Sequence, residues 1–135
     1  METFQETRIN ITQEIDIVTA RHAGRLLARE QGFDRVDETR ITTVISELAR
    51  NILSYATEGT IYIRTAIANG QRGVEILACD DGPGIENVQL ALRDGFSTSR
   101  GLGAGLPGVR RLMDEFDIKS TIGVGTQVMV KKWLR

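Results

Sequence analysis

The sequence predicts an α+β fold in which helices pack on one face of a mixed, mostly antiparallel sheet. Two observations lead to this prediction. Several segments alternate polar and apolar residues, as strands with one buried face do, and separate blocks repeat apolar residues at helical spacing. A chain of 135 residues with 41% hydrophobic residues can bury a core, so residues 1–135 are expected to form one domain.

The N-terminal half contains one predicted strand and two predicted helices. Thr7–Ile11 alternates polar and apolar residues and is expected to be a short strand. A helix is expected from about Thr12 to Gln31, ending at Gly32, which adopts a left-handed cap easily. Its apolar stripe is expected to be Ile15, Val18, Ala23, Leu26 and Leu27. A second helix is expected from about Asp37 to Tyr55, with the stripe Ile41, Val44, Ile45, Leu48 and Ile52.

The C-terminal half begins and ends with predicted hairpins. Thr60–Ala68 and Val74–Cys79 are rich in β-forming residues and are joined by Asn69–Gly73, a strong hairpin signal. A short helix is expected around Glu86–Arg93. A longer one begins near Leu106 with Pro107 in its first turn. The apolar face of that longer helix is expected to be Leu106, Val109, Leu112, Met113 and Phe116. Ile118–Ser120 and Thr126–Trp133 are expected to close the fold as a hairpin around Gly123–Gly125.

Composition excludes several classes of protein. The net charge of -1 with 26% charged residues provides no clustered positive charge for a phosphate backbone, so no nucleic-acid partner is expected. The N-terminus has no apolar signal region, and no segment is long and apolar enough to span a bilayer, so we expect a soluble cytoplasmic protein without a membrane partner. A single Cys79 excludes an intrachain disulfide and a thiol-based zinc site, and it is expected to be buried at a strand end.

The second predicted helix carries an acid and an amide on one flank. At about 100° per residue, Asn51 lies roughly 80° and Glu47 roughly 120° from the centre of the apolar stripe, whereas Thr43 and Arg50 lie at the back. Glu47 and Asn51 are therefore expected at the rim of the core. An amide oxygen can complete a Mg²⁺ shell made otherwise of water and phosphate oxygens. A carboxylate one turn earlier can accept a proton from an attacking hydroxyl.

A carboxylate also follows the strand that ends at Cys79, within the sequence Asp80-Asp81-Gly82-Pro83-Gly84. Glycines at this point let another group approach the backbone closely. Asp80 could accept a hydrogen bond from an exocyclic amino group such as that of adenine. An Asx turn that merely holds the loop is the alternative, with Asp81 as an equal competitor, and these residues alone do not decide between them.

A glycine-rich run, Gly101–Gly105, precedes the helix that begins near Leu106. Unpaired backbone N–H groups and the helix dipole would there face a phosphate. The run is not a dinucleotide-binding fingerprint, because the polar loop 95–100 precedes it instead of a strand. The lysine of a Walker-type P-loop is absent as well.

Taken together, these patterns resemble the nucleotide-binding boxes of the GHKL ATPase and kinase superfamily, which gyrase, Hsp90-type chaperones and histidine kinases share. The boxes are the Glu-x-x-x-Asn helix, the Asp-x-Gly-x-Gly turn, the Gly-x-Gly-x-Gly-Leu loop and Gly125-Thr126. The resemblance covers nearly the whole chain and implies the Bergerat-type sandwich of that superfamily. Within it, residues 47–52 and 101–114 are similar to the serine kinase switch proteins of bacterial stressosomes.

The resemblance implies a role for each matching residue, with ATP and Mg²⁺ as cofactors. Glu47 would be the general base, Asn51 the Mg²⁺ ligand and Asp80 the carboxylate that reads adenine. The other nucleotide-binding residues fall into two groups. Gly82, Gly84 and Thr126 would lie near the adenine ring. Arg100 would contact the γ-phosphate, and Gly101, Gly103 and Gly105, followed by Leu106, would form the hinge of a lid over the phosphates.

Partners follow from the same resemblance. Proteins of this kind phosphorylate a serine or threonine of STAS-domain scaffold proteins, then leave the scaffold and bind and activate a downstream effector. A monomer or weak dimer is expected. Two other functions stay open: an anti-sigma factor kinase, and a nucleotide-gated binding switch without catalysis, although the intact Glu47 argues against the switch. A free-standing histidine kinase is disfavoured, because the lone His22 lies in the first predicted helix and is expected to face the surface or a partner.

Overall fold

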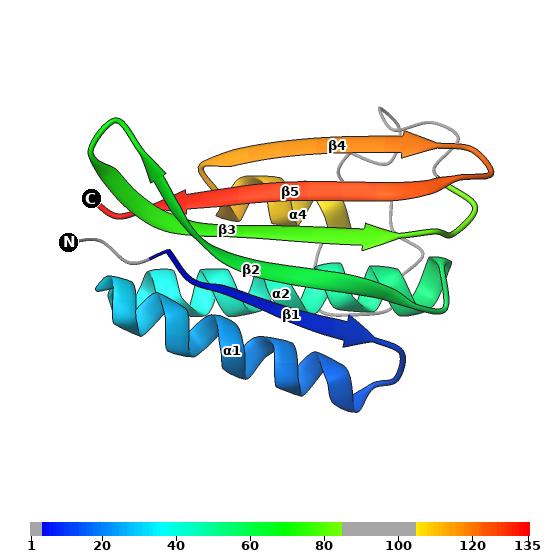
Figure 1. The fold of residues 1–135 in the computed structure, drawn as a ribbon, viewed down its shortest axis with the longest axis horizontal. Helices are drawn as coiled ribbons and strands as arrows, with labels where there is room; N and C mark the ends of the chain where they lie inside the picture. Colours follow the sequence, from blue (N-terminus) through cyan, green and yellow to red (C-terminus); the bar gives the residue numbers. More distant parts are fainter. Residues whose placement is uncertain (1–3, 85–104) are drawn as a thin grey trace.

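The computed structural model describes residues 4–84 and 105–135. Their helices and strands, labelled in Figure 1, are β1 (Glu6–Ile11), α1 (Ile15–Gln31), α2 (Arg35–Tyr55), β2 (Gly59–Ala68), β3 (Gln71–Asp80), α4 (Gly105–Leu112), β4 (Glu115–Thr121) and β5 (Gly125–Trp133). The short helix expected around Glu86–Arg93 lies outside the described residues.

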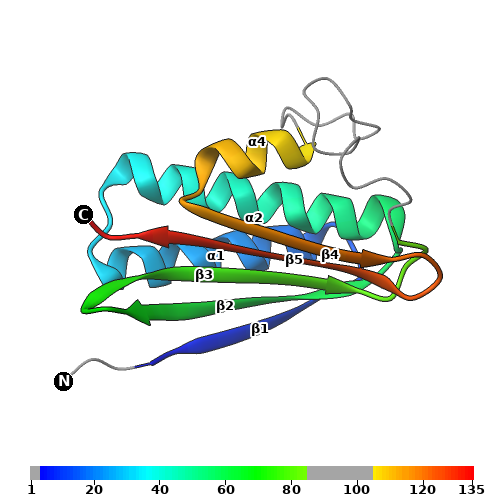
Figure 2. The same ribbon diagram turned by 90° about the horizontal axis from the view of Figure 1, so that it is seen from above.

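The strands form one sheet in the order β1-β2-β3-β5-β4. Each neighbouring pair is antiparallel, so the α+β fold is confirmed and the described sheet contains none of the parallel pairing that the term mixed allowed. Figure 2 shows α1, α2 and α4 together on one face of this sheet. In the described part of the chain, no helix is both long and apolar enough to cross a membrane.

The hairpin between β2 and β3 turns through two residues. Asn69 and Gly70 have φ angles of 52° and 79°, and Ala68 pairs directly with Gln71. Positive φ at both central residues defines the type I′ turn that matches the twist of antiparallel strands. The predicted hairpin is therefore confirmed, but its turn is shorter than expected, so β3 begins at Gln71 instead of Val74.

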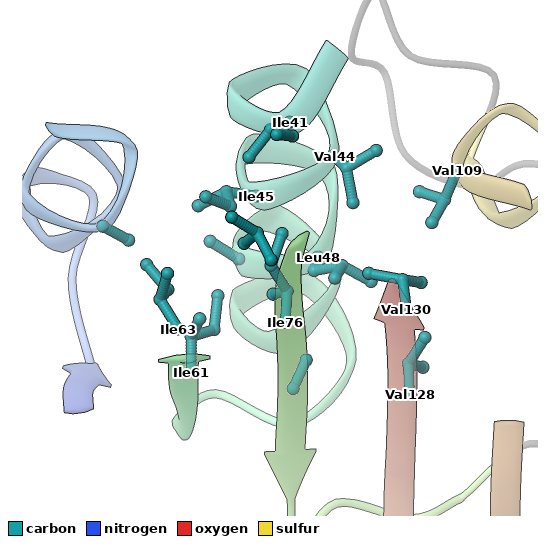
Figure 3. Packing of buried hydrophobic residues seen from close by; sticks show 14 of the residues in the cluster. Ile41, Val44, Ile45, Leu48, Ile61, Ile63, Ile76, Val109, Val128 and Val130 are labelled. Atoms are coloured by element: carbon teal, nitrogen blue, oxygen red, sulfur yellow. The ribbon is translucent and has the colours of Figure 1, made fainter. Parts of the chain in front are cut away.

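The core lies between α2 and the sheet. The predicted stripe of α2 is confirmed, since every one of its members is buried: Ile41, Val44, Ile45, Leu48 and Ile52. They form one cluster with Ile61 and Ile63 of β2, Ile76 of β3, and Val128 and Val130 of β5. Figure 3 shows Ile45 and Leu48 of α2 next to these strand residues. Asp34 caps the start of α2 by accepting the N–H of Asp37 at 2.8 Å, which places the helix start two residues before the expected one.

The stripe predicted for α1 was wrong for three of its five members. Ile15, Val18 and Leu26 are 59%, 54% and 46% exposed, whereas Leu27 is buried and Ala23 packs partly buried against the core. The buried face consists instead of Ile17, Ala20, Gly24, Leu27, Ala28 and Gln31. A Cβ on Gly24 would lie 2.1 Å from Cδ1 of Ile45, so α1 can approach α2 this closely only through small residues. This face is formed by Ala20, Gly24 and Ala28, which recur every four residues. The close packing of the two helices outweighs the burial of the larger apolar side chains of α1.

The start of α1 also differs from the prediction. Oδ2 of Asp16 accepts the backbone N–H groups of Thr12 and Gln13 at 2.9 and 3.1 Å, so both residues form a turn that precedes the helix. The hydrogen bond from the Thr12 backbone is the main cause that lowers the pKa of Asp16. The end of α1 is as expected, because Gly32 adopts the left-handed conformation with φ of 99°.

Phe116 lies in strand β4, not on the apolar face of a helix. α4 ends at Leu112, whose carbonyl accepts the Nζ of Lys132 at 3.0 Å. Asp114 then redirects the chain: its N–H donates to the carbonyl of Lys131, and its Oδ2 accepts the N–H of Trp133 at 2.7 Å. These bonds attach the chain to β5 immediately after the helix, so β4 begins at Glu115, three residues earlier than expected.

Candidate nucleotide-binding site

Glu47 and Asn51 lie on the flank of α2 that faces away from α1. Glu47 is 3% exposed and Asn51 is half-buried. At about 100° per residue, they lie roughly 160° and 120° from Ile45, which contacts α1. Val44, roughly 20° from Asn51, is on the side of α2 toward Val109 of α4 (Figure 3). Glu47 is thus more deeply buried than the expected position at the rim of the core.

The carboxylate of Glu47 is only partly satisfied. Its Oε1 lies 3.4 Å from Nη1 of Arg50, which is 41% exposed. Its Oε2 is buried and has no hydrogen-bond partner among the residues that the structure describes. A buried oxygen without a partner carries a desolvation penalty, which a proton donor entering the site would relieve. Such an oxygen is suited to accept a proton from a hydroxyl.

Asp80 ends β3 between two neighbouring strands. It pairs in register with Gly59 on β2 and with Thr126 on β5. Its Oδ1 accepts the N–H of Gly82 at 2.9 Å, so the Asx turn considered from the sequence is present. A carboxylate has two oxygens, and a turn on Oδ1 is compatible with a hydrogen bond to Oδ2 from an amino group. Asp81 is exposed, whereas Asp80 is half-buried.

Glycines bring the Asp80 turn against the end of α2. A Cβ on Gly82 would lie 2.6 Å from Cβ of Ala56, and a Cβ on Gly59 would lie 2.8 Å from Cγ2 of Ile52. Backbones can approach this closely only where no side chain intervenes. Gly59 was not singled out from the sequence, and its only signal is its position at the start of a strand directly after α2.

The turn between β4 and β5 supports the Asp80 loop from the other side. The carbonyl of Pro83 accepts the N–H of Gly123 at 2.9 Å. Gly84 has φ of 81°, and a Cβ there would lie 2.5 Å from the carbonyl oxygen of Thr121. The hydroxyl of Thr126 lies 2.8 Å from that of Ser120, a contact that the sequence did not reveal. This hydrogen bond ties Thr126, which pairs in register with Asp80, to strand β4.

The start of α4 is described, but most of the preceding glycine loop is not. Gly105 is buried with φ of 67°, and Leu106 is 8% exposed and packs into the core. The side chain of Leu106 therefore serves the core, and its backbone is the part that could face a ligand. The predicted contacts of Arg100, Gly101 and Gly103 lie outside the described residues.

Cys79, directly before Asp80, is half-buried rather than buried as expected. Its neighbours in register are Thr60 on β2 and Gln127 on β5. Burial is the main cause that raises the pKa of its thiol, and the hydrogen bond with Gln127 acts in the opposite direction. A thiol with a raised pKa is a weak nucleophile, so we assign it no part in the chemistry of the site.

The residues fit a magnesium ion held mainly by a nucleotide. In residues 4–84 and 105–135, no group of three or more His, Cys, Asp and Glu side chains is arranged to hold a metal. A cage built only from protein ligands is therefore not available there. Mg²⁺ typically takes one or two protein ligands and completes its shell with phosphate oxygens and water, and the amide of Asn51 is a suitable single ligand.

Known proteins share the sequence pattern of this chain. The pattern of the family described as "Histidine kinase-, DNA gyrase B-, and HSP90-like ATPase" matches residues 36–135. The serine/threonine-protein kinase RsbT of Bacillus subtilis (strain 168) is 55% identical over 127 residues, which cover 94% of this chain and 96% of RsbT. The anti-sigma F factor of Caldanaerobacter subterraneus subsp. tengcongensis is 34% identical over 100 residues, covering 70% of this chain and 68% of that protein.

Two solved structures share the fold at low sequence identity. The catalytic domain of the histidine kinase ThkA is 19% identical with a TM-score of 0.52, covering 97% of this chain and 95% of that domain. A structure of RsbU and RsbW domains from Mycobacterium tuberculosis is 20% identical with a TM-score of 0.63. It matches 99% of this chain, which spans 34% of that longer chain.

Proposed function

The chain belongs to the family of histidine kinase-, DNA gyrase B- and HSP90-like ATPases, and we propose that it transfers the γ-phosphate of ATP to a serine or threonine of a STAS-domain scaffold protein, with Glu47 as general base. It is a serine/threonine-protein kinase of the partner-switching type, as the 55% identity to RsbT over 94% of the chain shows. The substrate and the roles of single residues are the proposed part.

The observation that supports these roles is the order of residues along α2. The Asp80 turn packs on Ala56 through Gly82 at the end of the helix. At 1.5 Å per residue, Asn51 lies about 7–8 Å and Glu47 about 13–14 Å further back along the axis. The groups of ATP follow one another in the same order. Adenine would lie at Asp80, the phosphates and Mg²⁺ at Asn51, and the transferred phosphoryl group at Glu47.

In the proposed reaction the protein mainly positions groups and moves one proton. Glu47 accepts the proton of the substrate hydroxyl on its buried Oε2 while the hydroxyl oxygen bonds to the γ-phosphorus. The bond between that phosphorus and the β,γ-bridging oxygen breaks, and ADP leaves. Asn51 would hold Mg²⁺, which would supply positive charge against the phosphates. Arg50, 3.4 Å from Oε1, holds the carboxylate in one orientation.

The proposed setting is the bacterial stressosome. After phosphorylating the scaffold, the kinase would leave it and activate a downstream effector by binding it, in the cytoplasm and as a monomer or weak dimer. Residues 1–135 would act as one domain. The support is the RsbT relative, which matches this chain over almost the full length of both proteins.

One alternative has a specific observation in its favour. The relative named anti-sigma F factor is 34% identical over 100 residues, so the same boxes could serve a kinase that also sequesters a sigma factor. The lower identity and the coverage of 70%, against 94% for RsbT, make this the second candidate.

The experiment that tests the proposal uses γ-labelled ATP, Mg²⁺ and purified STAS-domain scaffold and anti-sigma-antagonist proteins from the same genome. Mass spectrometry then identifies the modified residue. Label on a serine or threonine of the scaffold supports the proposal. Label only on the anti-sigma antagonist would favour the alternative, and binding without any label would favour a nucleotide-gated switch.

A further inference from the structure

A row of three polar side chains crosses the sheet at the end where Asp80 lies. Asp80 on β3 pairs in register with Thr126 on β5, and Thr126 pairs in register with Ser120 on β4. These three strands lie next to one another in the sheet (Figure 1). The residue two positions earlier on β3 and β4, and two positions later on β5, packs in the core or against it. Because side chains alternate between the faces of a strand, all three polar side chains lie on the face that the helices cover.

The hydroxyl of Ser120 takes part in two hydrogen bonds, which together fix the direction of each. Its Oγ lies 3.3 Å from the carbonyl oxygen of Gly125 and 2.8 Å from Oγ1 of Thr126. A carbonyl oxygen can only accept and a hydroxyl has one proton, so the proton of Ser120 points to Gly125. The bond between the two hydroxyls then requires Thr126 to be the donor. The hydroxyl of Thr126 is left with lone pairs, which can accept a hydrogen bond from a ligand but not donate one.

The carbonyl that receives the proton of Ser120 is itself held by the fold. Gly125 has φ of 149°, in the region that favours glycine, and a Cβ there would lie 2.1 Å from the carbonyl oxygen of Asp80. The backbone of Gly125 therefore packs directly on that of Asp80. The same contact that places the carboxylate of Asp80 thus also places the acceptor that determines where the proton of Thr126 points.

We infer that Ser120 is a positioning residue that sets the nucleobase preference of the site, because it keeps Thr126 and Asp80 as two neighbouring acceptors for the exocyclic amino group of adenine. The two N–H bonds of one amino group diverge by about 120°, so acceptors about 2.9 Å from its nitrogen lie about 5 Å apart. Residues opposite one another on antiparallel strands have Cβ atoms about 4.5–5.5 Å apart, and Asp80 and Thr126 are such a pair. Each can accept one N–H. This inference rests on the proposed place of adenine at Asp80.

Loss of the Ser120 hydroxyl would release the proton of Thr126. An ionised carboxylate accepts hydrogen bonds more strongly than a neutral oxygen does, so the hydroxyl of Thr126 would turn toward Asp80, its neighbour across the strands. The amino group of adenine would then lose one acceptor and compete with Thr126 for the other. A base without this amino group would lose nothing, so the preference of the site for adenine over such a base should fall.

The test compares the affinities for ATP and for purine riboside triphosphate, which is ATP without the amino group. Calorimetric titration with Mg²⁺ gives the two dissociation constants, and their ratio is the amino preference of each variant. Ser120→Ala should reduce the amino preference about 3–10-fold, which is the scale of one hydrogen bond. Ser120→Thr keeps the hydroxyl and should retain the preference of the wild type. A merely structural Ser120 would weaken both nucleotides equally, and an unchanged ratio in Ser120→Ala would overturn the inference.

Two further substitutions show whether Ser120 acts through Thr126. Thr126→Val removes the hydroxyl and should reduce the amino preference by itself, and Ser120→Ala in the same protein should then reduce it no further. Thr121→Ala is the matched control, because Thr121 is the next residue of β4, is exposed and faces the other side of the sheet. Its amino preference should equal that of the wild type. Additive reductions by Ser120→Ala and Thr126→Val, or an equal reduction by Thr121→Ala, would contradict the inference.

The choice of affinity as the readout separates this inference from the proposed transfer reaction. The ratio of dissociation constants involves neither Glu47 nor a substrate hydroxyl, so a failure of the proposed transfer would leave the predicted ratios in place. A wild type that binds both nucleotides equally would overturn the role of Ser120, because the site would then make no use of the amino group. Label on a scaffold serine or threonine would still support the proposed function in that case.

Discussion

The Nη1 atom of Arg50 lies 3.4 Å from Oε1 of Glu47, one turn apart on α2. The two side chains are unequally placed, because Glu47 is almost fully buried while Arg50 reaches solvent. The pair therefore occupies one oxygen of the carboxylate and leaves the buried Oε2 without a partner among the described residues. From helical geometry Arg50 was expected at the back of the helix, and its contact with the acid is seen in the structure.

Arg50→Met should slow phosphoryl transfer about 10-fold, because the carboxylate loses the partner that orients it. Nucleotide affinity should stay within a few fold, since Arg50 reaches Glu47 and not the Asp80 end of the helix. Single-turnover rates and calorimetric titration measure the two quantities. Arg50→Lys, which keeps the charge, should recover part of the rate. If the methionine variant transfers phosphate as fast as the wild type, the contact is merely structural.

Asp80→Asn should abolish measurable ATP binding, whereas Asp81→Asn should have a smaller effect. An asparagine at position 80 can still accept the N–H of Gly82, so the turn is kept while the carboxylate is lost. The exposed Asp81 is the matched control. Calorimetric titration with ATP measures both, and equal losses would mean that Asp80 does not read the base.

Asn51→Ala should weaken nucleotide binding in the presence of Mg²⁺ far more than in its absence. The amide is the proposed protein ligand of the metal, and its loss leaves only phosphate and water oxygens around the ion. Dissociation constants for ATP are compared with Mg²⁺ and with a chelator. An unchanged metal dependence would assign Asn51 a structural role.

Gly82→Ala should weaken ATP binding and lower stability by about 1–3 kcal/mol, because the added methyl group would lie 2.6 Å from Cβ of Ala56 and displace the Asp80 turn. Gly70→Ala is the control. Its Cβ would meet nothing within 4 Å, but φ of 79° strains an alanine there by about 1–2 kcal/mol. Urea denaturation should show a loss in both variants, and calorimetry should show weaker binding only in Gly82→Ala. Normal affinity in Gly82→Ala would separate this glycine from the site.

Strand patterns and the stripe of α2 could be predicted from the sequence because one period explains each of them. The buried stripe from Ile41 to Ile52 is an example. The turn at Asn69 and Gly70 could be predicted for a different reason, because asparagine and glycine readily adopt the positive φ angles that it requires. α1 could not be predicted in the same way, because two apolar faces compete on it. The small-residue face is the buried one because α1 approaches α2 closely at Gly24. This contact with Ile45 is not contained in any local sequence pattern.

The candidate site was partly predictable for a similar reason. Glu47 and Asn51 share a flank by helical geometry, and Asp80 follows a strand, so both features are local. What joins them is not local: Gly59 and Gly82 allow the turn to meet α2, and Ser120 holds Thr126 from another strand. Small residues in such contacts leave little signal in a single sequence, because their function is to leave space.

The rate of phosphoryl transfer in Glu47→Gln tests the central claim most directly. Glutamine nearly preserves the shape of the buried side chain but cannot accept the proton of a substrate hydroxyl. With ATP, Mg²⁺ and the STAS-domain scaffold protein, single-turnover transfer to serine or threonine should fall by about 10²-fold or more, while ATP affinity stays within a few fold. Transfer at the wild-type rate by a variant that binds ATP normally would contradict the assignment of Glu47 as the general base.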